Sequence, residues 1–68
     1  MERHFQLNWQ SFVQEAIQKR KEQRLTQAHL AVLSGVSKPT IVAFEHGKTS
    51  LKLETALKIL STLGMAKI

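Results

Sequence analysis

Residues 26–48 read Thr-Gln-Ala-His-Leu-Ala-Val-Leu-Ser-Gly-Val-Ser-Lys-Pro-Thr-Ile-Val-Ala-Phe-Glu-His-Gly-Lys, and this stretch decides the fold. It holds two segments that can each form a short helix. Thr26 and Ser37 each precede one segment, and their hydroxyls can accept hydrogen bonds from the free amides of a first helical turn. Gly35 lies between the segments and suits the left-handed backbone that ends a helix. We therefore predict two short helices joined at a tight turn.

The two short helices are expected over about residues 27–34 and from residue 38 to near His46, in the layout of a helix-turn-helix. Pro39 falls in the first turn of the second helix, where its missing amide has no intrahelical role. Gly47 closes that helix. The residues expected to face the core are Leu30, Ala31, Ile41 and Phe44.

A longer helix is expected before this pair. Asn8 is a good N-cap for it, and the apolar residues that follow recur at the spacing of one buried helical face. These residues are Trp9, Phe12, Val13, Ala16 and Ile17. One more turn of the same stripe lands on Arg20, which is a charge on an apolar face. Because breaking a buried ion pair costs about 3–5 kcal/mol, we expect Arg20 to have a carboxylate partner.

A fourth helix is expected near the end of the chain. It carries one apolar stripe and stops at Gly64, with Met65 placed to pack back on Leu60. The stripe consists of Leu53, Ala56, Leu57, Leu60 and Leu63. The start of this helix is left open, because Ser50 can cap it or, alternatively, residues 51–52 belong to the preceding loop.

The length of the chain allows one domain at most. Residues 1–68 are therefore predicted to form a single compact all-α domain of four to five helices. A chain this short buries only about 60% of its unfolded surface, so its stability as a monomer is marginal. No cysteine is present, which excludes disulfides and thiolate metal sites. Dimerisation is the remaining source of stability that we expect.

Charge and composition narrow the class of function. Ten Lys and Arg against five acidic residues give a net charge of +5, and this balance favours a polyanionic partner such as nucleic acid. No Asp or Tyr is present and the five Glu are scattered, so we expect no catalytic site, no metal and no cofactor. Polar residues interrupt every apolar run, which predicts a cytoplasmic chain without a membrane span or signal peptide.

Several different short motifs lie between residue 25 and residue 64. They are Leu-Thr-Gln at 25–27, Leu-Ala at 30–31, Gly-Val-Ser at 35–37, Ile41, Glu-x-Gly-Lys at 45–48, Leu-Glu-Thr-Ala-Leu at 53–57 and Leu-Gly at 63–64. With them the chain resembles the lambda-repressor-like (Cro/CI, XRE-type) helix-turn-helix domains of bacterial and phage regulators, over about residues 12–65. The resemblance implies a DNA-binding domain whose helix-turn-helix motif covers about residues 26–46.

The resemblance also implies a partner for Arg20. Members of the family often pair an arginine seven residues before the motif glutamine with the glutamate that ends the recognition helix. In this chain those positions are Arg20 and Glu45, which would form a structural ion pair.

By the same resemblance, the second short helix is the recognition helix, which lies in the major groove with its N-terminal residues at base edges. The positions that match base-reading sites are Lys38, Pro39, Thr40 and Ala43. Lys38 can donate to guanine O6 and N7, whereas the methyl groups of Thr40 and Ala43 can lie against a thymine methyl. The alternative for Lys38 is a solvated lysine in a first helical turn.

Phosphate contacts are implied for a second set of residues, which are Gln27, His46, Lys48, Ser50 and Arg24. Relatives use a glutamine at the position of Gln27 to bond a phosphate, and the alternative is an exposed residue without a partner. His46 replaces an asparagine common in the family, so the resemblance does not establish whether this position contacts a phosphate. For Arg24 the alternative is a solvated charged face.

The function that the resemblance implies is a sequence-specific transcriptional regulator, a repressor that binds double-stranded DNA as a homodimer on a pseudo-palindromic operator. Two alternatives remain open. One is the antitoxin of a HipB-like toxin–antitoxin pair, which binds a toxin and autoregulates its operon. The other is a protein-interaction module that has lost DNA binding, for which the apolar pair Val32 and Leu33 on the outer face of a helix argues.

Overall fold

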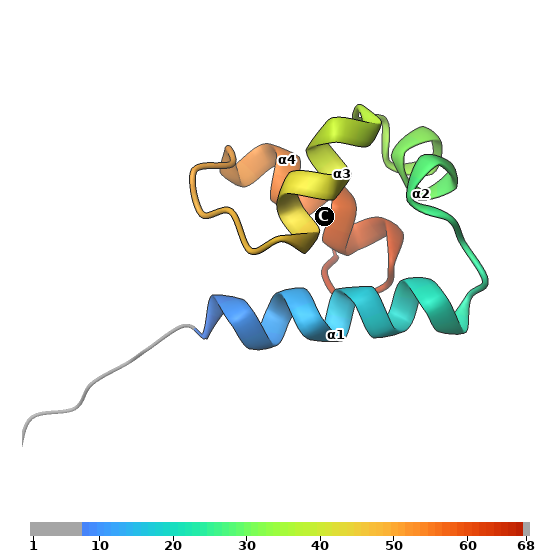
Figure 1. Cartoon of the computed structure of the whole chain (residues 1–68), viewed down its shortest axis with the longest axis horizontal. Coiled ribbons are helices and arrows are strands. Elements are labelled where there is room, and N and C mark those ends of the chain that lie inside the picture. Colours follow the sequence, from blue (N-terminus) through green and yellow to red (C-terminus); the bar gives the residue numbers. More distant parts are fainter. Residues whose placement is uncertain (1–7, 68) are drawn as a thin grey trace, which may run out of the picture.

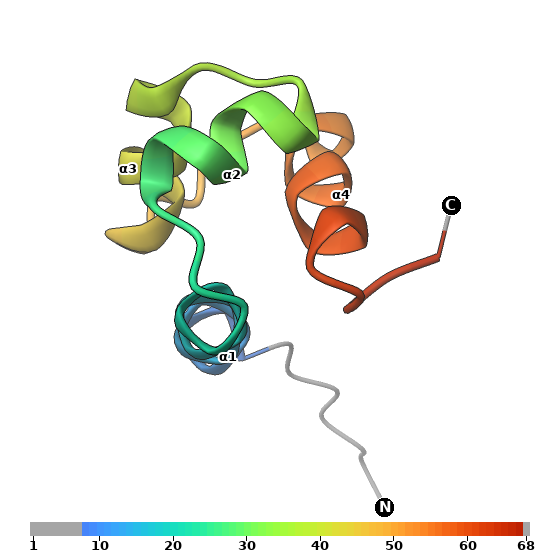
Figure 2. The same ribbon diagram turned by 90° about the vertical axis from the view of Figure 1, so that its right-hand side faces the viewer.

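The structure is a computed structural model that describes residues 8–67. Four helices follow one another in it: α1 (Trp9–Glu22), α2 (Gln27–Ser34), α3 (Lys38–Glu45) and α4 (Leu53–Thr62). Figure 1 shows α1 along one edge of the domain, and the view along α1 in Figure 2 places the other three helices together on one side of it. The prediction of an all-α domain is confirmed, with four helices within the described residues.

The first three helices begin with side-chain caps at the predicted residues. Asn8 accepts a hydrogen bond from the amide three residues ahead at 3.1 Å. Thr26 and Ser37 do the same for α2 and α3, at 3.0 and 3.3 Å. Helix α4 differs, because its N-cap is Lys52, which makes no side-chain cap bond. Ser50 therefore does not cap α4, since a capping side chain has to stand directly before the first helical residue. The loop extends through residue 52.

All four helices end in the same way. After each helix, its first or second following residue adopts a left-handed backbone. The amide of the next residue then donates to a carbonyl five residues back, at 2.8–3.1 Å. The predicted ending of α4 is one of these, with the Met65 amide 2.8 Å from the Leu60 carbonyl. Glycine supplies the left-handed residue after α2, α3 and α4, whereas Arg24, at φ 59°, supplies it after α1. Arg24 is thus the one described residue with a side chain in this conformation.

Arg24→Gly is expected to stabilise the domain by about 0.5–1 kcal/mol. A side chain in the left-handed region costs roughly 1–2 kcal/mol, of which the greater freedom of an unfolded glycine returns about 0.5–1 kcal/mol. Urea unfolding measures the difference. Arg24→Ala is the matched control, because it removes the same charge and keeps the Cβ atom. Equal effects of the two substitutions would show that the backbone conformation carries no strain.

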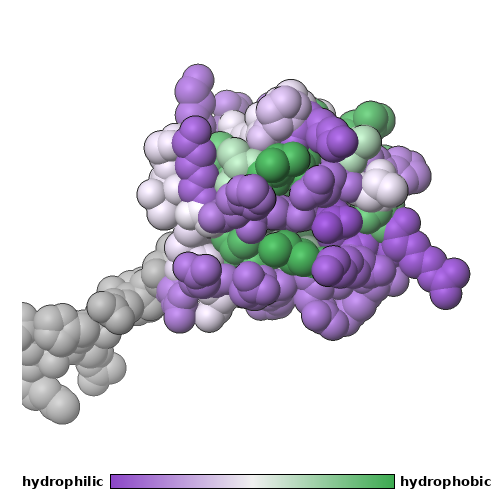
Figure 3. Space-filling view, viewed as in Figure 1, coloured by the Kyte–Doolittle hydropathy of each residue, from purple (hydrophilic) through white to green (hydrophobic). Residues whose placement is uncertain are grey.

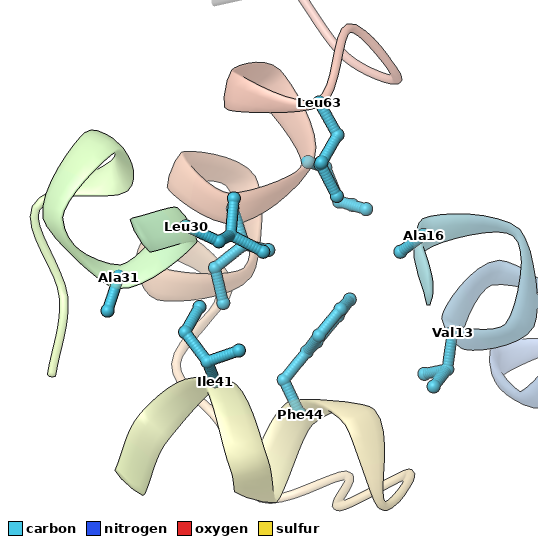
Figure 4. Packing of buried hydrophobic residues seen from close by; sticks show 9 residues of the cluster. Val13, Ala16, Leu30, Ala31, Ile41, Phe44 and Leu63 are labelled. Atoms are coloured by element: carbon cyan, nitrogen blue, oxygen red, sulfur yellow. The ribbon is translucent and has the colours of Figure 1, made fainter. Parts of the chain in front are cut away.

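The core lies where the four helices meet. Phe44 is fully buried, and Figure 4 shows its side chain extending from α3 toward Val13 and Ala16 of α1. The ring of Trp9 meets that of Phe44 edge to face, with centroids 5.7 Å apart and an angle of 82° between the planes. The residues predicted to face the core from α2 and α3 are all buried: Leu30, Ala31, Ile41 and Phe44. The pair of short helices therefore has the predicted orientation.

The apolar stripe predicted for α4 is partly wrong. Leu53 is 74% exposed and Leu57 is partly buried, whereas Ile59, absent from the predicted stripe, is fully buried. The residues that enter the core are Ala56, Ile59, Leu60 and Leu63. The physical reason is the position of Leu53. As the first residue of α4 it directly follows the loop, at the edge of the domain, where the described residues leave most of its side chain uncovered.

Candidate nucleic-acid interface

Arg20 of α1 binds Glu45, the last residue of α3. Its Nε donates to Oε2 at 2.6 Å and its Nη2 donates to Oε1 at 3.2 Å, so the guanidinium meets both carboxylate oxygens. The two side chains are 12% and 7% exposed. The structure thus brings together the two residues that the family resemblance paired, across 25 positions of the chain.

Arg20 also fixes the turn between α1 and α2. Its Nη1 donates to the Leu25 carbonyl at 2.7 Å, while its own carbonyl accepts from the Leu25 amide at 3.1 Å. One residue therefore holds both backbone polar groups of Leu25. The chain enters α2 two residues later, so the starting point of the helix-turn-helix is set by the same arginine that binds α3.

Gln27 joins this cluster from the first turn of α2. Its Nε2 donates to Glu45 Oε1 at 2.9 Å. The alternative of a Gln27 side chain without a partner is therefore wrong. Sequence reasoning missed this bond, although one signal was available. A carboxylate has about four acceptor sites and Arg20 fills only part of them, so a buried glutamate at this place calls for a further donor.

The residues expected to read bases lie along α3. Lys38 and Pro39 are exposed, and Thr40 and Ala43 are partly buried. The Thr40 hydroxyl lies 2.7 Å from that of Ser37, with which it shares a hydrogen bond at the helix start. Within residues 8–67, Lys38 is the charged residue of the N-terminal turn of α3, and it forms no ion pair with another described residue.

The residues expected to contact phosphates lie on both sides of α3. Arg24 is exposed in the turn between α1 and α2, and His46, Lys48 and Ser50 are exposed in the segment between α3 and α4. In Figure 1 these two connections lie to the right and left of α3. Gln27, partly buried, begins α2. Three basic side chains and one serine thus flank the helix expected to enter the groove.

The side of the domain on which α3 lies is shown in Figure 3. Hydrophilic side chains cover most of it, and the hydrophobic areas between them are small. Among residues 8–67, no group of three or more His, Cys, Asp or Glu is arranged to hold a metal ion. Within the same residues, every helix falls short of the length and apolar character that crossing a membrane requires.

Two short helices held at a fixed angle, the second with an exposed polar N-terminal turn, define the class of helix-turn-helix domains. A family model of helix-turn-helix domains matches residues 17–66. The chain belongs to this family, as an XRE-type, lambda-repressor-like helix-turn-helix domain. The family is one of binding domains without enzymatic activity, which agrees with the expectation from composition.

A relative among known proteins is similar in sequence. The chain is 41% identical over 54 residues to a protein of Haemophilus influenzae described as an uncharacterized HTH-type transcriptional regulator. The matched region covers 79% of this chain and 55% of the relative. The chain thus spans about half the length of the curated relative that it matches.

Glu45→Ala is expected to lower the free energy of unfolding by about 3–5 kcal/mol, because it leaves the Arg20 guanidinium buried without its partner. Thermal or urea unfolding followed by circular dichroism measures the loss, and a variant already unfolded at 25 °C meets the expectation. Glu15→Ala, at an exposed position of α1, is the control and should change stability by less than about 0.5 kcal/mol. A Glu45→Ala melt equal to that of the wild type contradicts the role given to the ion pair.

Proposed function

We propose that the chain is a sequence-specific DNA-binding transcriptional regulator, a cytoplasmic repressor that acts as a homodimer on a pseudo-palindromic operator. The observation that supports it most is the setting of α3. Ile41 and Phe44 bury one face of this helix in the core, and Glu45 ties its end to Arg20. Lys38 remains exposed at the other end. A helix held in this way can enter a major groove without losing its own support.

Electrostatics favour the same function. The chain has a net charge of +5, and the basic residues Arg24, His46 and Lys48 are exposed on the connections beside α3. Contacts from such residues to phosphates would fix the register of α3 in the groove, while sequence would be read by α3 itself. The relative from Haemophilus influenzae is named as an HTH-type transcriptional regulator, which supports the proposal at the level of the family.

Lys48→Ala is expected to weaken DNA binding about equally for every sequence. The fall of log K with log salt should become less steep by about 0.9, which is the contribution of one neutralised phosphate. Fluorescence anisotropy at several salt concentrations measures both quantities. A binding constant of the wild type that does not change with salt contradicts the proposal and favours a protein-interaction module instead.

Lys38→Ala is expected to change sequence preference rather than affinity alone. Selection of bound duplexes from random DNA gives the operator of the wild type, and the same selection with the variant should lose discrimination at one base position, by about 1–3 kcal/mol. Lys58→Ala, at an exposed position of α4, is the matched control and should leave the selected sequence unchanged. Uniform weakening by Lys38→Ala would instead make Lys38 a phosphate contact.

The proposed dimer contact lies at the start of α4. A single recognition helix reads few bases, and two-fold dimers of this class read two half-sites. Leu53 is 74% exposed, and it stands at a cavity of about 280 Å³ whose other lining residues are Trp9, Thr49, Leu51 and Ala56. In a two-fold contact the same surface is used by both partners. Each Leu53 would then cover the apolar cavity of the other protomer.

Leu53→Lys is expected to abolish dimerisation and to leave the fold intact, because the side chain is mostly exposed in the monomer. Analytical ultracentrifugation at micromolar concentration, with and without an operator duplex, gives the oligomeric state. Leu33→Lys is the matched control, since it places the same charge at an exposed leucine of α2. A wild type that stays monomeric even on a duplex with two half-sites rules out the homodimer.

A second candidate function rests on the outer face of α2. Val32 and Leu33 are 77% and 55% exposed, and neighbouring exposed apolar residues favour a protein partner. An antitoxin that binds a toxin through this pair and represses its own operon would combine both functions. A kinase-like toxin encoded beside this chain would support that form of the proposal, and co-purification of the two proteins, lost in Val32→Ser, would test it.

A further inference from the structure

The Glu45 carboxylate accepts three hydrogen bonds, and their geometry determines how the Gln27 amide is turned. Two come from Arg20, and the third comes from Gln27 Nε2 at 2.9 Å. A carboxylate only accepts, so the nitrogen of the amide faces Glu45 and its oxygen faces away. One of the two Nε2 protons is used in this bond. The other remains available for a second acceptor.

The charge of Glu45 does not oppose a phosphate near this amide. A lone carboxylate beside DNA repels phosphates, but the guanidinium of Arg20 lies against both of its oxygens. The Glu45 side chain is also only 7% exposed, so it is shielded from a partner at the surface. Gln27 lies in the first turn of α2, and its amide keeps one N–H that is not used in the bond to Glu45. It is therefore the member of the cluster suited to touch DNA.

We propose that Glu45 is a positioning residue for DNA binding: it holds the Gln27 amide so that the remaining N–H is set in advance to donate to a phosphate oxygen. Arg20 holds Glu45 in turn, so the ion pair of the core extends to the DNA contact. The inference rests on the proposed DNA-binding function. Its physical basis is preorganisation, since a side chain already fixed in the free protein loses less freedom on binding.

A double-mutant cycle in DNA affinity tests the coupling. Gln27→Ala, Glu45→Gln and the double variant are titrated onto the duplex selected by the wild type, at a temperature where each is folded. We expect Gln27→Ala to weaken binding about tenfold, as for one hydrogen bond to a charged group. Glu45→Gln should weaken it severalfold, and the double variant should bind no worse than Gln27→Ala. Fold losses that multiply would overturn the inference, because independent residues add in free energy.

Lys48 supplies the matched control cycle. Lys48→Ala combined with Glu45→Gln should give losses that multiply, because Lys48 lies in the segment after α3 and its side chain shares no hydrogen bond with Glu45 among the described residues. If the losses of affinity multiply for Lys48 and Glu45 but not for Gln27 and Glu45, the coupling is assigned to the hydrogen bond between Gln27 and Glu45. Equal behaviour of both cycles would mean that Glu45→Gln acts through the fold as a whole, which overturns the positioning role.

Nuclear magnetic resonance on the unchanged protein covers the case in which Glu45→Gln does not fold. The two Nε2 protons of Gln27 give separate signals, and adding the duplex should shift the proton that is not bonded to Glu45. If backbone amides of α3 shift while both Gln27 protons stay in place, DNA binding stands and the positioning role is overturned. If no signal in the protein shifts, the proposed function fails as well.

Discussion

The contact between Arg20 and Glu45 determines how the other parts of the domain are placed. It joins the longest helix to the end of α3, and Arg20 also binds the backbone of Leu25 just before α2. Helices α2 and α3 have eight residues each, and helices this short are not stable alone in water. Their mutual angle therefore has to come from contacts with the rest of the chain. Burial of apolar side chains in the core holds the helices together, and the ion pair fixes their orientation.

The net energy of such a pair is smaller than its geometry suggests. Removing two charges from water costs several kcal/mol per ion, which the attraction between them only roughly offsets. A pair of apolar residues could give similar stability, but it would not reach Leu25 and Gln27 with directed hydrogen bonds. The value of Arg20 and Glu45 for this domain thus lies in the orientation that they impose on three helices, and only secondarily in stability.

Much of this fold could be predicted from the sequence, because the deciding signals are local. The cap residues Asn8, Thr26 and Ser37 set three helix starts, and a stripe with helical spacing placed Arg20 on a buried face. The partner of Arg20 could not be derived in this way, since any of several glutamates satisfies the same need. The resemblance to a family, and not the physical argument, pointed to Glu45.

The error in α4 and the unpredicted bond of Gln27 have a common physical cause. The stripe through Leu53 and Leu57 and the stripe through Ile59 have the same helical spacing, so periodicity cannot choose between them. Only the neighbouring helices decide which face is covered. The bond from Gln27 to Glu45 likewise joins residues 18 positions apart. The acceptor sites that Arg20 leaves on Glu45 call for a further donor, but no local pattern identifies Gln27 as that donor. The base and phosphate contacts depend on a partner outside the chain, and they remain predictions.

Because the ion pair is largely buried, ionic strength affects it less than it affects contacts between surface cations and phosphates. Mobile ions screen charges in solvent, but they reach a pair that is only 12% and 7% exposed much less. Contacts between surface cations and phosphates, in contrast, weaken steeply as salt displaces them. A rise in salt would therefore release this domain from DNA before it disturbed the arrangement of α1, α2 and α3. Under the proposed function, the domain would leave DNA folded and ready to bind again once the salt concentration falls.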